Sequence, residues 1–364
     1  MKIKDVISLL EELAPLSYTE DFDNTGLLVG DKNDTVSGIL VTLDTLESVI
    51  DEAISNNCNL ILSFHPIVFS GLKKLTGRNY VERTVIKAIK NNIAIFAIHT
   101  ALDNSWNGVN AMICDKLKLQ NRKILIPKKN TIQKLTTYVP LKSVDKVRGA
   151  LFNSGAGNIG NYSNCSFNIE GTGSYMGNDK SNPVIGKKGE LRLEKEVQIG
   201  ITYQKHVHSS VLKALFNSHP YEEVAYEVIS LENNNQQIGM GMIGELETPL
   251  NENDFLRFLK ESMKTKCVRH SKLTQSSISK IAVLGGSGSF AINAAKQAGA
   301  DVFVTADLKY HDFFNAENSI LLADIGHYES EQFTKELLVS FLNKKISTFA
   351  VVLSQINTNP ITYY

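Results

Sequence analysis

The chain has 364 residues, of which 43% are hydrophobic and 21% are charged, and its 38 Lys and Arg residues balance its 38 Asp and Glu residues. This length allows two or three domains with a sizeable core. The zero net charge argues against a generic nucleic-acid binder, which carries a basic excess, so nucleic acid is not an expected partner. No run approaches the roughly 20 apolar residues of a membrane helix, so no membrane partner is expected either.

The cysteines and the first residues indicate the compartment. Four cysteines lie far apart and form no CxxC pair, which argues against a zinc knuckle or a redox motif and fits a reducing environment. The apolar stretch near the N-terminus is too short and too acidic for a signal peptide. We therefore expect a cytoplasmic protein.

The first 128 residues alternate strand and helix patterns. Apolar runs predict strands at 37–44, 60–66 and 93–100, and an amphipathic helical pattern follows each of them. Such alternation predicts right-handed crossovers and a mostly parallel sheet that helices cover on both faces.

Residues 129–245 differ in character, because Gly, Asn and Ser fill long loops between antiparallel-looking strands. Two short helices are expected near 143–153 and 208–217. The resulting β-α-β-β-α-β order suits a ferredoxin-like α+β domain.

From residue 246 the first pattern resumes, with strands expected at 301–307 and 319–327. The predicted fold is therefore an α/β domain with a mostly parallel layered sheet, formed by residues 1–128 and 246–364. The ferredoxin-like domain of residues 129–245 is inserted into it.

Polar residues gather where the predicted strands end. In open parallel sheets, ligands bind outside the carboxyl ends of the strands. The residues at these ends include three of the eight histidines and two aspartates: Asp44, His65, His99, Asp307 and His327. One such histidine is usually a satisfied core residue, but three on one rim indicate a site.

Two of these histidines have a carboxylate four residues later, namely Asp103 after His99 and Glu331 after His327. In a helix, such pairs lie on one face and can share a cation. Together with His65 they predict a site for Zn, Fe, Mn, Co or Ni, and the residue types do not choose among these metals. The absence of cysteine excludes a closed thiolate zinc site and favours the catalytic type, which activates water at neutral pH. A second cation would need a bridging carboxylate, for which Glu331 is best placed.

Three further motifs are less specific. The Gly-rich turn at 284–290 lacks a GK[ST] sequence and is equally consistent with a phosphate cradle at a helix N-terminus and with a tight structural turn. Lys309 and His311, near the same rim, could meet an anion or belong to a solvated helix start. The sequence HPYEE at 219–223 is better interpreted as a turn than as a site.

Seven segments together, in order along essentially the whole chain, resemble the Nif-three-like family, whose members are also labelled type 2 homologues of GTP cyclohydrolase I. They are DNTGLLVG, HPIVFSGLKKL, HTALDNSWNGVN, HPYEEVAYEV, GGSGS, DVFVTADLKYHD and DIGHYESE. The resemblance implies a two-metal site in the α/β domain and a toroidal homohexamer, in which the inserted domain of the longer bacterial members caps the openings of the ring.

The resemblance also implies the ligands. The metal-binding positions of the family fall on His65, Asp103, His327 and Glu331, with Glu331 as the bridge, and His99 falls near the metals. The chain departs from the family at Phe64, where the typical form has a second histidine before the proline. We therefore expect one firmly held divalent metal per chain, with the second weak or absent.

Two functions follow as expectations. The first is a metal-dependent hydrolase acting on a small, nucleotide-like substrate, in which His99 or Lys309 assists proton transfer or neutralises charge. The alternative is a non-catalytic hexameric scaffold or regulator that binds metal or another ligand.

Overall fold

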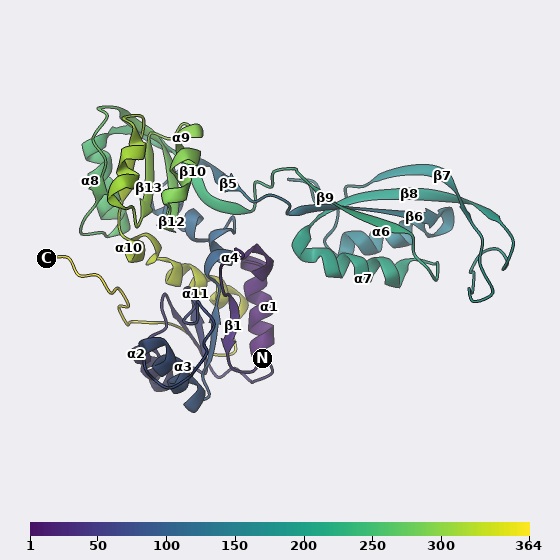
Figure 1. Ribbon diagram of the computed structural model, residues 1–364, viewed down its shortest axis with the longest axis horizontal. Coiled ribbons are helices and arrows are strands. Elements are labelled where there is room, and N and C mark those ends of the chain that lie inside the picture. Colours follow the sequence, from purple (N-terminus) through teal and green to yellow (C-terminus); the bar gives the residue numbers. More distant parts are fainter. The chain divides into compact units, whose positions relative to one another are not determined.

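The computed structural model describes residues 1–364, which divide into two compact units. The first unit consists of Met1–Pro127 and Gln236–Tyr364, and the second of Lys128–Asn235. Figure 1 shows their elements in sequence colours. No helix in the chain combines the length and the apolar character needed to cross a membrane.

The first unit contains a five-stranded sheet with the order β1-β4-β3-β2-β15. Its strands are β1 (Gly26–Val29), β2 (Ile39–Thr42), β3 (Leu60–Ser63), β4 (Ala94–Ala97) and β15 (Val351–Leu353). All pairs are parallel except β1 with β4 at the edge. Every residue of β2, β3 and β4 is buried, as their continuous apolar runs predict for parallel strands covered on both faces.

A six-stranded sheet, also in the first unit, has the order β11-β14-β13-β12-β10-β5. Its strands are β5 (Gln120–Pro127), β10 (Gly239–Asn251), β11 (Arg269–His270), β12 (Ser277–Ser287), β13 (Val302–Ala306) and β14 (Leu321–Asp324). Only β12, β13 and β14 are parallel to one another. The expectation of a mostly parallel sheet is wrong here, because β5 and β10 carry the chain to and from the second unit and therefore pair antiparallel.

Helices separate and cover the two sheets. They are α1 (Ile3–Leu13), α2 (Glu47–Ser55), α3 (Tyr80–Lys90), α4 (His99–Asp103), α5 (Val109–Lys116), α8 (Glu252–Met263), α9 (Ile292–Gln297), α10 (His327–Glu331) and α11 (Thr334–Lys345). Short 3₁₀ turns are η1 (Leu16–Tyr18), η4 (Ser289–Ala291) and η5 (Tyr310–Ala316).

One hydrophobic core joins the two sheets. Leu62 and Val283, from the five- and six-stranded sheets, belong to the same buried cluster as Leu10, Phe255 and Leu338 of α1, α8 and α11. Separate clusters cover the outer faces, with α2 and α3 on the five-stranded sheet and α9 on the six-stranded sheet. The shared core holds both sheets in one unit, so residues from either sheet can contribute to one site.

The second unit has the element order β6 (Ile132–Pro140), η2 (Leu141–Ser143), α6 (Val144–Asn153), β7 (Phe167–Tyr175), β8 (Arg192–Gln204), η3 (Lys205–Val207), α7 (His208–Ser218) and β9 (Tyr226–Leu231). Its sheet order is β7-β8-β6-β9, all antiparallel, and α6 and α7 lie along one face (Figure 1). The unit ends at Asn235, whereas the sequence interpretation places the boundary at 245. The difference arises because Gly239–Asn251 is a single strand of the first unit.

The turn into α5 generates a prediction about stability. A Cβ at Gly108 would lie 1.8 Å from the carbonyl oxygen of Leu102. We expect Gly108→Ala to lower the free energy of unfolding by at least about 2 kcal/mol, because the backbone of a packed turn must move. Denaturant unfolding followed by the fluorescence of Trp106, the one tryptophan of the chain, measures this.

Gly71→Ala is the matched control, since a Cβ at Gly71 meets nothing within 4 Å. This change should leave the unfolding midpoint nearly unchanged. Equal midpoints for the two variants would contradict the steric argument.

Candidate metal centre

His65 lies just beyond the end of β3, in the five-stranded sheet. Its backbone N–H donates to the carbonyl oxygen of Leu43, so the chain still runs beside the segment that follows β2. Its Nδ1 lies 2.8 Å from Oδ1 of Asp44, and Oδ2 of Asp44 accepts a hydrogen bond of 2.6 Å from Thr358. The carboxylate accepts a hydrogen bond from Nδ1–H and so keeps a proton on that nitrogen, which makes Nε2 the atom available to a ligand.

His327 begins α10, directly after β14 of the six-stranded sheet, and is held in the same way. Its Nδ1 lies 2.7 Å from Oδ2 of Asp307, which follows β13 with a left-handed φ of 57°. One helical turn later, Glu331 places its carboxylate on the same face of α10, as the spacing of four residues predicts.

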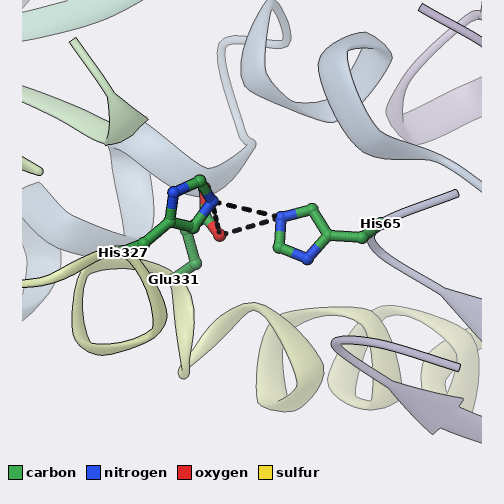
Figure 2. Close-up of side chains that lie close together, drawn as sticks. All are labelled: His65, His327 and Glu331. Carbon is green, nitrogen blue, oxygen red and sulfur yellow. Dashed lines mark hydrogen bonds and ion pairs between the residues drawn. The ribbon is translucent and has the colours of Figure 1, made fainter. Parts of the chain in front are cut away.

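These three side chains converge, although they come from different sheets. Figure 2 shows His65 and His327 pointing their Nε2 atoms toward Glu331. Oε2 of Glu331 lies 3.1 Å from Nε2 of His65 and 3.3 Å from Nε2 of His327, and the two nitrogens are 3.4 Å apart. The three donor atoms lie within 4.8 Å of one another, so they form a possible metal site. We call these residues the triad.

The electrostatics of the triad favour a bound cation. Burial raises the pKa of Glu331, but the charge of His65 and the contact with His327 outweigh it and bring this pKa to about 2. Burial alone would lower the pKa of His65, yet the charge of Glu331 and the contact with Asp44 raise it to about 10. Burial also lowers the pKa of His327, but the contact with Glu331 and its charge outweigh burial and raise this pKa to about 9. A metal that takes these nitrogens must displace protons, which are the only positive charges now facing the carboxylate.

Two buried carboxylate oxygens near the triad have no well-formed hydrogen bond, which suits atoms that bind a metal ion. Oε2 of Glu331 and Oδ1 of Asp103 are inaccessible and accept no hydrogen bond of normal geometry. The side chain of Glu331 is only 3% exposed, so an unpaired charge there would be costly. Oxygen and imidazole donors of this kind suit a divalent transition metal.

The glycine turn is part of the centre. A Cβ at Gly286, where φ is 68°, would lie 2.5 Å from Oε1 of Glu331, so this position admits the carboxylate only because it is glycine. The N–H of Gly286 donates to Ser330 and that of Gly285 to Asn110. Because these donors are already used, the structure favours the tight turn over the phosphate cradle.

Asp103, the fourth predicted ligand, is not one of the triad. It ends α4 and lies near the triad, because burial and then the charge of Glu331 raise the pKa of Asp103 well above its usual value. His99, four residues before Asp103, makes its hydrogen bond elsewhere. Nδ1 of His99 instead lies 2.9 Å from Oδ1 of Asp23, whose other oxygen accepts from Thr100.

Phe64 packs against His65 and His99. It is fully buried in the core that joins the sheets, with its ring centroid 4.9 Å from that of His65 and 5.4 Å from that of His99. A phenyl ring has no lone pair to offer, so the position before His65 supplies no metal ligand.

Lys309, expected to assist catalysis, lies on the exposed rim beyond Asp307. Its backbone N–H donates to the carboxylate of Asp312, and its ammonium group makes no contact with the triad. Sequence reasoning placed Asp44 and Asp307 at this edge without giving them a role, and it missed Asp23. The contact between Asp23 and His99 spans 76 residues, so no local spacing could reveal it.

Comparison with known proteins gives the family. The Duf34/NIF3 (NGG1p interacting factor 3) family model matches residues 1–360. A protein of Bacillus subtilis named GTP cyclohydrolase 1 type 2 homolog is 38% identical, covering 99% of this chain and 98% of the relative. A protein of the same name from Halalkalibacterium halodurans is 37% identical over 98% of each chain.

Solved structures agree with this result. The crystal structure of a Bacillus cereus protein related to NIF3 matches with a TM-score of 0.86 and 35% identity, covering 100% of this chain and 99% of that one. The crystal structure of a Staphylococcus aureus protein matches with a TM-score of 0.79 and 31% identity, covering 100% of this chain and 99% of that one. The motifs, the mixed α/β fold and the match along the whole chain lead to one conclusion: this protein belongs to the Duf34/NIF3 family.

Proposed function

We propose that the protein binds a divalent metal through His65, His327 and Glu331. The observation that carries this proposal is the buried oxygen of Glu331, which faces two imidazole nitrogens and accepts no normal hydrogen bond. Asp44 and Asp307 orient these imidazoles from behind, as outer carboxylates do in metal sites.

A second metal would have to use Asp103 and share Glu331. Phe64 stands where the resemblance implies a further imidazole. Asp103 and Glu331 would therefore hold the second metal without a histidine at position 64. We therefore propose one firmly held metal per chain and a weak or absent second one.

We further propose that the centre serves a metal-dependent hydrolase with a nucleotide-like substrate. A divalent cation held by the triad would supply Lewis-acid chemistry at neutral pH. His99 is the residue placed to move a proton, because Asp23 takes Nδ1 and leaves Nε2 toward the centre, with its ring centroid 5.2 Å from that of His65. The name of the Bacillus subtilis relative supports a nucleotide as the substrate class.

One observation favours the alternative of a non-catalytic metal-binding scaffold or regulator. Phe64 removes a ligand from a centre that would otherwise hold two cations, and a single structural metal would satisfy the buried charge of Glu331 equally well. Metal content, metal affinity and turnover separate the two functions.

We also infer that residues 128–235 form a ferredoxin-like domain. The sheet order β7-β8-β6-β9 and the position of α6 and α7 on one face support this.

The number of metals tests the effect of Phe64. After dialysis, we expect elemental analysis to find about one metal per chain in the natural protein and about two in Phe64→His, because the new imidazole would join Asp103 and Glu331. Phe216→His, which adds an exposed histidine in the second unit, should stay at one. Two tightly held metals in the unchanged protein would contradict the proposal.

The outer carboxylate generates a second test. We expect Asp44→Ala to weaken zinc binding by about 10- to 100-fold, because His65 loses the group that fixes its tautomer and its ring orientation. Competition with a chromophoric chelator measures the affinity. Asp31→Ala, in an exposed loop, is the control, and an unchanged affinity in Asp44→Ala would show that Asp44 does not orient the ligand.

Turnover tests the reaction. On a panel of nucleotides that includes GTP, we expect product formation that needs a divalent metal and that falls about 100-fold or more in His99→Ala, because the proton-transfer group is lost. His270→Ala, an exposed histidine in β11, should behave like the natural protein. If Glu331→Ala loses its metal and no metal-loaded form turns over any substrate, the scaffold is favoured and the hydrolase is not.

A further inference from the structure

A cavity of about 630 Å³ lies within the second unit, and none of its lining residues belongs to the metal centre. The backbone of the second half of β7, the loop after it and the turn between α7 and β9 form its walls. This volume is in the range of small-molecule sites.

The turn at 219–223 is built to hold one wall in place. Nε2 of His219 lies 3.0 Å from the carbonyl oxygen of Tyr138, and its Nδ1 accepts a hydrogen bond of 3.1 Å from the N–H of Tyr221. His219 is buried, and both of its nitrogens are used in a neutral ring. The histidine of the HPYEE sequence is therefore a structural residue that positions Tyr221 and the glutamates after it.

The opposite wall is tied to this turn. The N–H of Asn182, in the loop after β7, donates to Oε2 of Glu222 over 2.7 Å, and the hydroxyl of Tyr175 donates to the carbonyl oxygen of Ile185. One hydrogen bond thus links the two walls, and a second holds the loop against β7, so the cavity is partly enclosed.

All the charged residues that line the cavity are acidic. Glu170, Glu196, Glu222 and Glu223 line the cavity, and no Lys, Arg or His does. Glu196 is only 8% exposed, and its Oε1 accepts the hydroxyl of Tyr221 over 2.7 Å. Walls of one sign around a partly enclosed space concentrate the opposite charge.

Arg192 and Lys195 of β8 lie near the cavity, and Lys195 contacts Thr172, which is one of the lining residues. Arg192 pairs with Glu194 at 2.6 Å, and Nζ of Lys195 donates to Thr172 over 3.1 Å. Both side chains are exposed and lie outside the lining.

Aromatic rings complete the lining. Tyr175 and Tyr221 meet edge to face with centroids 5.7 Å apart, and Tyr138 also lines the cavity. Tyrosine rings attract cations through their faces, and more strongly where water is excluded.

A metal ion does not fit these groups. The one cluster of His, Cys, Asp and Glu donors in the chain that is close enough to hold a metal is the triad of the first unit. No three of the cavity's glutamates bring their oxygens that close together, so their charge suits a larger, spread-out cation better than a metal ion.

We propose that the second unit binds a small aliphatic ammonium compound in this cavity, between the tyrosine rings and the four glutamates. This site is independent of the metal centre and of the reaction proposed there.

Calorimetric titration of the full-length protein tests the proposal with choline and spermidine as probes. We expect at least one of them to bind at least about tenfold more tightly than 3,3-dimethylbutan-1-ol, the neutral counterpart of choline, because the charge provides the attraction. Added salt should weaken the binding, and citrate should not bind.

Variants locate the site. Combined Glu170→Gln and Glu223→Gln should weaken binding of the cation at least fivefold, whereas Glu232→Gln, an exposed glutamate outside the lining, should not. His65→Ala should bind the cation normally, which separates this result from any failure at the metal centre. The proposal is overturned if neither cation binds, if the neutral alcohol binds equally well, or if the paired glutamate variant binds like the natural protein.

Discussion

A carboxylate buried between two imidazoles is the constraint on which the architecture depends. Glu331 is 3% exposed, and a charge so far from water is tolerated only with a positive partner. The groups that face it are His65 and His327, which are 262 residues apart and follow strands of different sheets. The shared hydrophobic core that packs the two sheets into one unit is what makes the meeting possible.

The backbone near the centre follows from the same constraint. Gly286 leaves room for the carboxylate of Glu331, and Asp307 adopts a left-handed conformation that brings its side chain to His327. Gly286 lies near the end of β12 and Asp307 directly follows β13, two parallel strands whose buried apolar side chains fix their register. The polar centre is therefore positioned by apolar packing on both sides.

Much of this arrangement is readable in the sequence. Apolar runs predict the strands, and the histidines at their ends predict an edge where ligands gather, because parallel strands present their carboxyl ends together. The spacing of His327 and Glu331 predicts their contact, because residues four apart lie on one face of a helix and both belong to α10. The spacing of His99 and Asp103 does not reveal the hydrogen bond of His99, whose partner Asp23 lies 76 residues away. The antiparallel half of the second sheet was also missed, since hydrophobic pattern does not tell which strand a chain will join when it returns from an insertion.

The segment after β15 contacts both sides of the centre. Thr358 donates to Asp44, behind His65, while the side-chain amide of Asn359 donates to Glu329, within the helix that carries His327 and Glu331. A short extended stretch thus ties the ends of two sheets through two adjacent side chains. Because the order of this stretch and the alignment of the histidines depend on the same hydrogen bonds, we expect binding at the centre to protect the stretch from proteases. Cleavage there would in turn loosen the centre without removing any of the triad.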